Sequence, residues 1–261
     1  MFESPLDLAA ARILVTNDDG INAPGLKVLE RVARSFSKDV WVVAPETEQS
    51  GAGHSLPLSR PLRHRRISAR RHAVNGSPTD CVLFAIEQVM GGRKPDIVLS
   101  GVNRGANLGE DVTYSGTVAA AMEATLLGVP AVAFSLAARH GSQIHWGAAE
   151  ENAPAILKKL VSTRWPRDVF MNVNFPNLLP AEIKGARIVS QGRRESDYNL
   201  IGLTDPRGNR YYWIGPQHEG NLLRHDDTDY HAISDGAIAV TPLHVDLTHE
   251  GALKLLREAF R

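Results

Sequence analysis

Two adjacent aspartates, Asp18 and Asp19, follow a short apolar run at Ile13–Thr16. In open α/β sheets, ligands bind beyond the carboxyl ends of the strands, so the pair points toward a binding site. Neighbouring carboxylates repel each other, and a divalent cation relieves that repulsion at neutral pH. The sequence Asn-Asp-Asp-Gly also forms good turns without any ligand, and an ordinary turn is the alternative interpretation.

A serine and an asparagine follow two other apolar runs. Ser50 lies in the polar loop after Val40–Ala44, and Asn103 lies in the glycine-containing loop after Ile97–Ser100. Taken alone, Ser50 is adequately explained as part of a solvated loop. Together with the two aspartates, these residues offer only oxygen atoms. Such a set favours one divalent cation, Mg²⁺, Mn²⁺ or Ca²⁺, over zinc.

A possible anion site lies at Ser115, Gly116 and Thr117, where a helix is predicted to begin. Hydroxyls and free backbone N–H groups at a helix N-terminus favour an anion such as phosphate. Ser115 is equally suited to cap the helix, and capping requires no ligand. The chain has no Gly-x4-Gly-Lys-Ser/Thr motif, which excludes a P-loop, and the glycines after Ile97–Ser100 do not form Gly-x-Gly-x-x-Gly.

The elements that position these residues alternate between two periodicities. Continuous apolar runs are typical of strands covered on both faces, and the segments between them have helical spacing. This alternation predicts an α/β fold with a Rossmann-like, doubly wound, mostly parallel sheet. The predicted strands are Ile13–Thr16, Val40–Ala44, Ile97–Ser100, Val129–Phe134 and Val169–Phe175, and the predicted helices are Leu26–Ala33, Val82–Val89, Thr117–Leu127 and Ala148–Val161.

The regular pattern weakens toward the C-terminus. Residues 191–235 have little hydrophobic periodicity and predict hairpins and extended arms, followed by a strand at Ile238–Thr241 and a helix at Glu250–Phe260. A long aperiodic stretch in a compact domain is unusual, and an arm that joins subunits is one ordinary explanation. We therefore predict an α/β catalytic domain over residues 1–190, carrying all candidate site residues, and an oligomerisation extension over residues 191–261.

Composition limits the class of protein. The 261 residues contain 29 Lys+Arg and 29 Asp+Glu, so no basic excess favours a stable nucleic-acid or membrane partner. No run approaches the ~18 apolar residues of a membrane span. The single cysteine, Cys81, cannot form an intramolecular disulfide, fits a reducing compartment and is interpreted as a core thiol. These features predict a cytoplasmic globular protein.

Two further polar clusters are explained without a bound ligand. Six arginines fall between Arg60 and Arg71, which we interpret as a solvated strand pair, with polyphosphate or nucleic-acid contact as a minor alternative. His218, His225 and His231 fit no compact zinc signature, so a second metal site is not expected there.

Five segments of the chain form extended motifs: VTNDDGINAPG, VVAPETEQSG, VNGSPTDCV, PDIVLSGVNRGANLGEDVTYSGTVAAAMEA and GVPAVAFS. Together they resemble the signature of the SurE family of metal-dependent 5′/3′-nucleotidases. Weaker similarity continues through Tyr211–Gly215, Thr228-Asp229 and Val240–Leu243, whereas Asp235–Ala239 departs from the usual Gly-Tyr-x-Ser run and leaves the arm geometry open.

The resemblance implies a role for each matching residue. It implies that one divalent cation is held by Asp18, Asp19, Ser50 and Asn103, and that phosphate is contacted by Asn107, Ser115, Gly116 and Thr117. It further implies a Rossmann-like domain with an extension that supports homodimers or homotetramers. The substrates implied are nucleoside monophosphates and, in some members, short polyphosphate.

The function expected is hydrolysis of nucleoside 5′- and 3′-monophosphates by metal-activated water, with Asp18 and Asp19 as catalytic residues and one of them as general base. Two alternatives remain open. Asp18 could form an aspartyl-phosphate, although the Asp-x-Asp spacing of such phosphatases is absent. The protein could also bind nucleotides as a sensing module without turnover. The sequence does not indicate the preferred base or metal, the choice between 5′ and 3′ phosphates, or the choice between dimer and tetramer.

Overall fold

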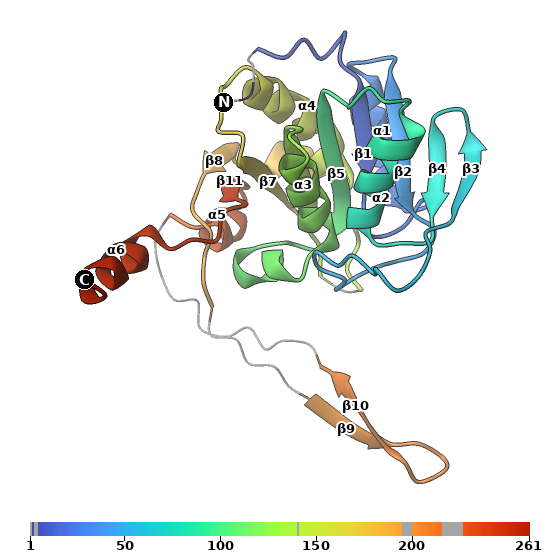
Figure 1. Cartoon of the computed structure of the whole chain (residues 1–261). Coiled ribbons are helices and arrows are strands. Elements are labelled where there is room, and N and C mark those ends of the chain that lie inside the picture. Colours follow the sequence, from blue (N-terminus) through green and yellow to red (C-terminus); the bar gives the residue numbers. More distant parts are fainter. Residues whose placement is uncertain (1, 3–4, 140, 195–199, 216–226) are drawn as a thin grey trace.

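A nine-stranded sheet forms the centre of the computed structural model, which describes residues 2, 5–139, 141–194, 200–215 and 227–261 (Figure 1). The strand order is β3-β4-β2-β1-β5-β6-β7-β11-β8. Strands β4, β2, β1, β5, β6 and β7 are parallel to one another, whereas β3 and β11 run antiparallel to β4 and β7. The predicted α/β fold with a mostly parallel sheet is confirmed. The strands are β1 (Ile13–Thr16), β2 (Val40–Pro45), β3 (His64–Ser68), β4 (Arg71–Val74), β5 (Ile97–Arg104), β6 (Ala131–Ala137), β7 (Val169–Pro176), β8 (Ala186–Ile188) and β11 (Ile238–His244).

Helices cover both faces of this sheet. Helices α1 (Pro24–Arg34) and α4 (Gly147–Val161) pack on one face, and α2 (Pro78–Phe84) and α3 (Gly116–Leu126) pack on the other. Strand residues alternate accordingly: Ile13 and Val15 belong to the core under α1, and Leu14 belongs to the core under α2 and α3. Burial on both faces explains why these strands are continuous apolar runs in the sequence. The shorter elements are the 3₁₀-helices Gly109–Thr113 and Pro180–Glu182 and the helix α5 (Asp229–Ser234).

Some boundaries differ from the prediction. Strand β5 continues to Arg104, so Asn103 lies in a strand and not in a loop. Its pairing with β6 shifts register between Ser100 and Asn103, and a bulge of this kind lets a strand continue past its regular ladder. Gly128, which has a φ of +79°, follows the end of helix α3. Strand β6 then begins at Ala131 and not at Val129 as predicted. The predicted helix over Val82–Val89 is α-helical to Phe84 and continues as a π-helix.

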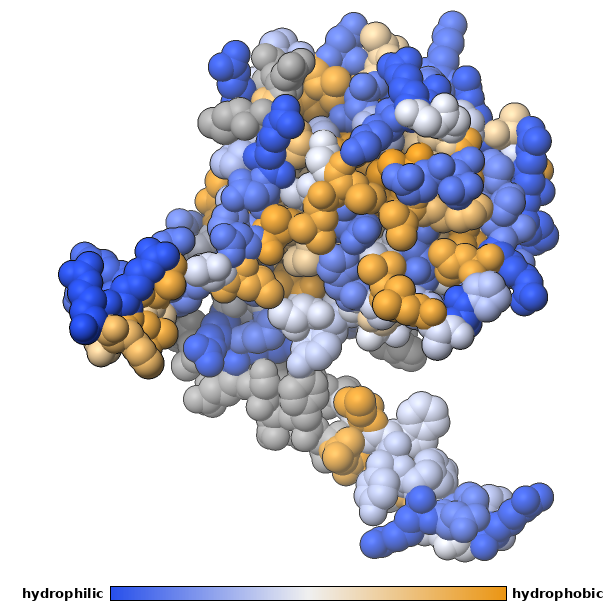
Figure 2. Space-filling view, viewed as in Figure 1, coloured by the Kyte–Doolittle hydropathy of each residue, from blue (hydrophilic) through white to orange (hydrophobic). Residues whose placement is uncertain are grey.

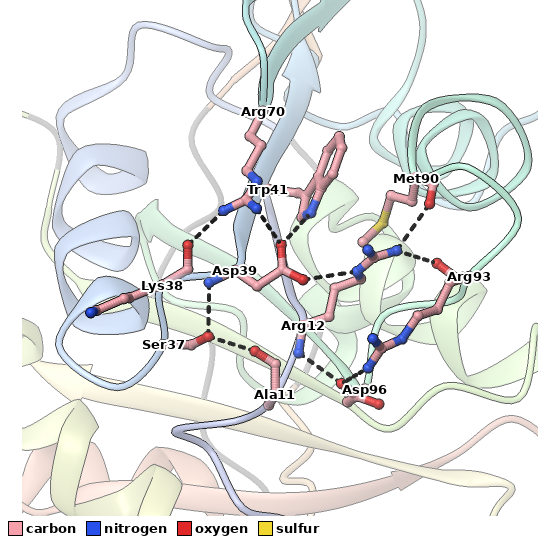
Figure 3. Close-up of polar contacts among 10 residues, drawn as sticks. All are labelled: Ala11, Arg12, Ser37, Lys38, Asp39, Trp41, Arg70, Met90, Arg93 and Asp96. Atoms are coloured by element: carbon pink, nitrogen blue, oxygen red, sulfur yellow. Dashed lines mark hydrogen bonds and ion pairs between the residues drawn. The ribbon is translucent and has the colours of Figure 1, made fainter.

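The amino ends of the parallel strands are joined by a polar network (Figure 3). Arg12 precedes β1 and donates from Nε to Asp39 Oδ2 at 3.0 Å, while its backbone N–H donates to Asp96 Oδ2 at 2.7 Å. Asp39 also accepts from Trp41 Nε1 at 2.9 Å and pairs with Arg70 at 3.4 Å. These contacts fasten the residues before β1, β2, β4 and β5 to one another. The carboxyl ends of these strands lie on the opposite side of the sheet, where Asp18 and Asp19 follow β1.

The chain after residue 190 both rejoins the sheet and extends away from it. Strand β11 pairs with β7 and β8, whereas β9 (Leu200–Thr204) and β10 (Arg210–Ile214) form a separate hairpin, as hairpins are predicted there. Helix α6 (Glu250–Ala259) also projects from the main body (Figure 1). The division at residue 190 remains a prediction.

The basic run forms the expected strand pair. Strand β3 is exposed along its whole length and forms the edge of the sheet, where it pairs with β4, which lies between β3 and β2. Among the residues placed by the structure, no helix has both the length and the apolar character that a membrane crossing requires.

Candidate functional site

Three segments meet around Asp18 and Asp19 at the carboxyl end of β1. The Thr117 hydroxyl, from the first turn of α3, donates to Asp18 Oδ1 at 2.5 Å. The backbone N–H of Gln49 donates to the Asp18 carbonyl at 2.8 Å, and the backbone N–H of Arg104 donates to Asp19 Oδ2 at 3.1 Å. The loop after β2, the end of β5 and the start of α3 therefore all contact the aspartate pair.

The N-terminus of α3 approaches Asp18 so closely that it requires glycine. A Cβ on Gly116 would lie 2.8 Å from Asp18 Cβ and 2.9 Å from Pro78 Cγ, distances that real side chains do not adopt. Ser115 caps the helix, because its hydroxyl accepts from the Val118 N–H at 3.1 Å. The capping interpretation of Ser115 is thus confirmed. The cap leaves the N–H groups of the first turn beside a carboxylate.

Burial makes the two carboxylates costly to ionise. Asp18 is only 4% exposed, and burial, with a smaller contribution from the Asp19 charge, raises its pKa to about 6. Burial also raises the pKa of Asp19, and the negative charge of Glu48 adds to this effect, whereas the hydrogen bond and charge of Arg104 oppose it. The site therefore concentrates negative charge in a partly dehydrated position, which a cation would compensate.

The two neutral candidate ligands lie on segments that contact the aspartate pair, Ser50 in the loop after β2 and Asn103 near the end of β5. The Ser50 hydroxyl donates to Glu48 Oε1 at 2.7 Å, next to the Gln49 that contacts Asp18. Asn103 donates from Nδ2 to the Gly105 carbonyl at 3.0 Å. This bond uses the NH₂ group of the amide, whereas a cation would bind its oxygen, Oδ1.

Asn107 is fastened to the strands beside the site. It is buried, its Nδ2 donates to Ser135 Oγ at 2.8 Å, and its backbone N–H donates to Asn174 Oδ1 at 2.8 Å. Its carbonyl accepts from Asn172 Nδ2 at 2.8 Å and from Asn174 Nδ2 at 3.0 Å. Sequence reasoning missed Ser135, Asn172 and Asn174. Their signal is the presence of polar residues at buried positions of the apolar strands β6 and β7.

A second contact missed from the sequence joins the Ser50 loop to α3. His54 Nε2 lies 2.7 Å from Oε2 of the buried Glu123, and the backbone N–H of Gly53 donates to the Tyr114 carbonyl at 3.1 Å. These contacts hold the loop after β2 against the helix that carries Thr117. They also explain the polar Glu123 within an otherwise apolar helix.

The residues at this edge fit a hard divalent cation. They supply two carboxylates, a hydroxyl and an amide carbonyl, and oxygen ligands of these kinds suit Mg²⁺, Mn²⁺ and Ca²⁺. Within the described ranges, no three His, Cys, Asp or Glu side chains are placed to hold a metal, and the predicted set contains only two such residues. The buried carboxylates are the feature that a cation would complement.

The remaining candidates behave as structural residues. Cys81 is buried in α2, and burial raises the pKa of its thiol, as expected for a core thiol. His231 lies 3.4 Å from Asp235, one turn along α5. His218 and His225 lie outside the described residues.

The fold and the site define a class: Rossmann-like α/β proteins with an acidic, hydroxyl-bearing site at the carboxyl edge of a parallel sheet. The chain belongs to the SurE family, because the family model described as "Survival protein SurE" matches residues 13–198. It is 55% identical over 259 residues to the 5′-nucleotidase SurE of Paramagnetospirillum magneticum, covering 99% of both chains. It is 50% identical to the 5′-nucleotidase SurE of Parvibaculum lavamentivorans, covering 95% of this chain and 90% of that one. The crystal structure of the SurE protein from Aquifex aeolicus superimposes with a TM-score of 0.83 at 40% identity, covering 95% of this chain and 99% of that one.

Proposed function

We propose that this protein is a metal-dependent phosphomonoesterase that hydrolyses nucleoside 5′- and 3′-monophosphates to nucleoside and phosphate. The observation that carries the proposal is the meeting of Asp18 with Thr117 and Gly116, which puts a buried carboxylate at a helix N-terminus. Relatives that are named 5′-nucleotidase SurE and match almost the whole chain support the hydrolysis of nucleoside 5′-monophosphates.

In this proposal, one divalent cation per subunit, Mg²⁺, Mn²⁺ or Ca²⁺, is held by Asp18, Asp19, Ser50 and Asn103. The chemistry supplied by such a cation is neutralisation of charge on a phosphoryl oxygen and a lower pKa for a nearby water. One of the two aspartates takes a proton from the attacking water as the water oxygen bonds to phosphorus and the bond between phosphorus and the nucleoside oxygen breaks. The leaving nucleoside oxygen takes a proton from solvent, the aspartate returns its proton to solvent, and phosphate is released.

The phosphate itself is held by Asn107, Ser115, Gly116 and Thr117. The dipole of α3 favours the phosphate charge at the start of the helix. Gly116 allows that backbone to lie directly beside Asp18, and Thr117 connects the same turn to the carboxylate. In this proposal, the start of α3 is the place where the phosphate residues meet the candidate cation ligands, through the contact of Thr117 with Asp18.

Assembly into a homodimer or homotetramer is part of the proposal, with residues 191–261 as the extension that joins subunits. The hairpin supports it, since Leu200, Tyr212, Trp213 and Ile214 are all more than half exposed. Figure 2 shows hydrophobic surface at the end of the hairpin nearer the main body. Short polyphosphate is a further proposed substrate, and the exposed arginines of β3 are the side chains to test for it.

The proposal predicts release of inorganic phosphate from a panel of nucleoside 5′- and 3′-monophosphates in the presence of Mn²⁺ or Mg²⁺. EDTA should remove the activity and added metal should restore it, because the carboxylates alone leave the phosphoryl charge uncompensated. The assay also ranks bases and compares 5′ with 3′ phosphates. Folded protein that binds nucleotides but releases no phosphate with any metal would contradict the proposal and support a sensing module.

A further inference from the structure

A buried carboxylate outside the proposed site holds the loop between β5 and α3. Asp229 is fully buried, and its Oδ2 accepts from the Gly109 N–H at 2.8 Å. Its Oδ1 accepts from the Gly192 N–H at 2.8 Å and from the Tyr230 N–H at 2.9 Å. One side chain thus satisfies backbone donors from the loop and from two C-terminal segments, and such charge-assisted bonds are strong.

Neighbouring residues reinforce the same junction. The Tyr230 hydroxyl donates to the Leu108 carbonyl at 3.2 Å, and Gln191 Nε2 donates to the Gly109 carbonyl at 2.8 Å. Arg194 forms an ion pair with Asp111. Each of these contacts joins Gln191, Arg194 or Tyr230 to the short stretch 108–111. The C-terminal part of the chain therefore clamps this loop.

Two glycines permit the close approach. Gly109 has a φ of +49°, and a Cβ there would lie 2.6 Å from the Tyr230 hydroxyl oxygen. A Cβ on Gly192 would lie 2.8 Å from Asp229 Oδ1. Gly192 thus leaves room for the Asp229 carboxylate, and Gly109 leaves room for the Tyr230 side chain beside it.

We propose that Asp229 is a positioning residue for phosphate hydrolysis: by holding Gly109, it sets the position of Asn107 on one side and of Ser115 and the start of α3 on the other. This inference rests on the proposed function. Gly109 begins the 3₁₀-helix Gly109–Thr113 that leads to Ser115, so a shift of Gly109 is passed along a rigid turn to the phosphate residues. Misplacement by about 1 Å is enough to impair a catalytic site substantially.

Asp229→Asn tests the proposal with little change of shape. Oδ1 of Asp229 serves two donors and Oδ2 serves one, so the amide oxygen is expected to keep the two donors and the NH₂ to face Gly109. The substitution thereby replaces the acceptor of Gly109 with a donor. Asp227→Asn is the matched control, because Asp227 is exposed and undergoes the same chemical change.

For Asp229→Asn we expect the KM for nucleoside monophosphate and the inhibition constant of inorganic phosphate to rise about tenfold relative to Asp227→Asn. Amide hydrogen exchange should become faster over residues 105–115 and stay unchanged in β1 and β5. If Asp229 only stabilised the fold, Asp229→Asn would reduce the fraction of active enzyme. The apparent kcat would then fall, whereas KM and the inhibition constant of phosphate would stay unchanged.

Equal constants and equal exchange in the two variants would overturn the inference while leaving the proposed function intact. Absence of phosphate release from the wild-type protein would instead refute the proposed function, and the inference with it, whatever the exchange comparison shows. If Asp229→Asn does not fold, Gln191→Ala serves in its place, since Gln191 is exposed and its amide holds the Gly109 carbonyl. It should raise both constants about two- to threefold, and unchanged constants would again overturn the inference.

Discussion

Asp18→Asn is expected to lower phosphate release about a thousandfold, equivalent to about 4 kcal/mol of transition-state stabilisation. Asp18 is the residue at which the site converges: its carboxylate accepts from Thr117 and its carbonyl accepts from Gln49. An amide keeps the shape but loses the negative charge that would hold the cation. The measurement is kcat/KM for phosphate release at saturating Mn²⁺.

The same substitution should leave the fold at least as stable in the absence of metal. Burial raises the pKa of Asp18 to about 6, above the usual value near 3.8, so ionisation opposes folding as the pH rises through this range. At pH 7 the neutral amide removes that cost, and its oxygen still accepts from Thr117. Urea unfolding in EDTA, with Asp227→Asn as control, checks this side of the prediction. Near-normal phosphate release from a folded Asp18→Asn protein would refute the cation-site assignment.

Gly116→Ala is expected to reduce kcat/KM about a hundredfold and to destabilise the fold by about 1–3 kcal/mol. The new methyl group would lie 2.8 Å from Asp18 Cβ, 2.9 Å from Pro78 Cγ and 3.1 Å from Asp18 Oδ2. Either the start of α3 or the aspartate loop must move. Both movements separate the proposed phosphate residues from the proposed cation ligands.

Gly251→Ala is the matched control for this change. Gly251 lies near the start of the exposed helix α6, where a Cβ would meet only the His249 ring, at 3.2 Å. Alanine should be tolerated there, since it also favours the helix. Steady-state kinetics and thermal unfolding of the two variants provide the comparison. Equal activity in both would show that the close approach of α3 to Asp18 has no functional role.

The sheet and its helices were predictable from the sequence because both depend on local pattern. The runs at Ile13–Thr16 and Val40–Ala44 are buried on both faces, and such burial produces continuous apolar sequence. Helix α3 was predictable from its Ser115 start, its alanine-rich body and its glycine terminator. The topology then requires the ends of parallel strands to meet at one edge, which is why Asp18, Asn103 and Ser50 could be assigned to one place.

The rest depends on contacts between residues far apart in the chain. The extension of β5 to Arg104 rests on a register shift against β6, and no local pattern encodes such a shift. The network of Asn107 with Asn172 and Asn174 pairs residues in different strands. The contacts of Asp229 could not be predicted from the sequence, because its donors, Gly109 and Gly192, approach it only in the folded chain.

The most direct test of the central claim is the position of Mn²⁺ in crystals of the protein, located by its anomalous scattering. We expect one strong peak per subunit in contact with the carboxylates of Asp18 and Asp19, with Ser50 and Asn103 as its further ligands. We expect no such peak in Asp18→Asn crystals prepared in the same way. A peak at other residues, or none at Asp18 and Asp19 in crystals of a protein that releases phosphate with Mn²⁺, would contradict the account.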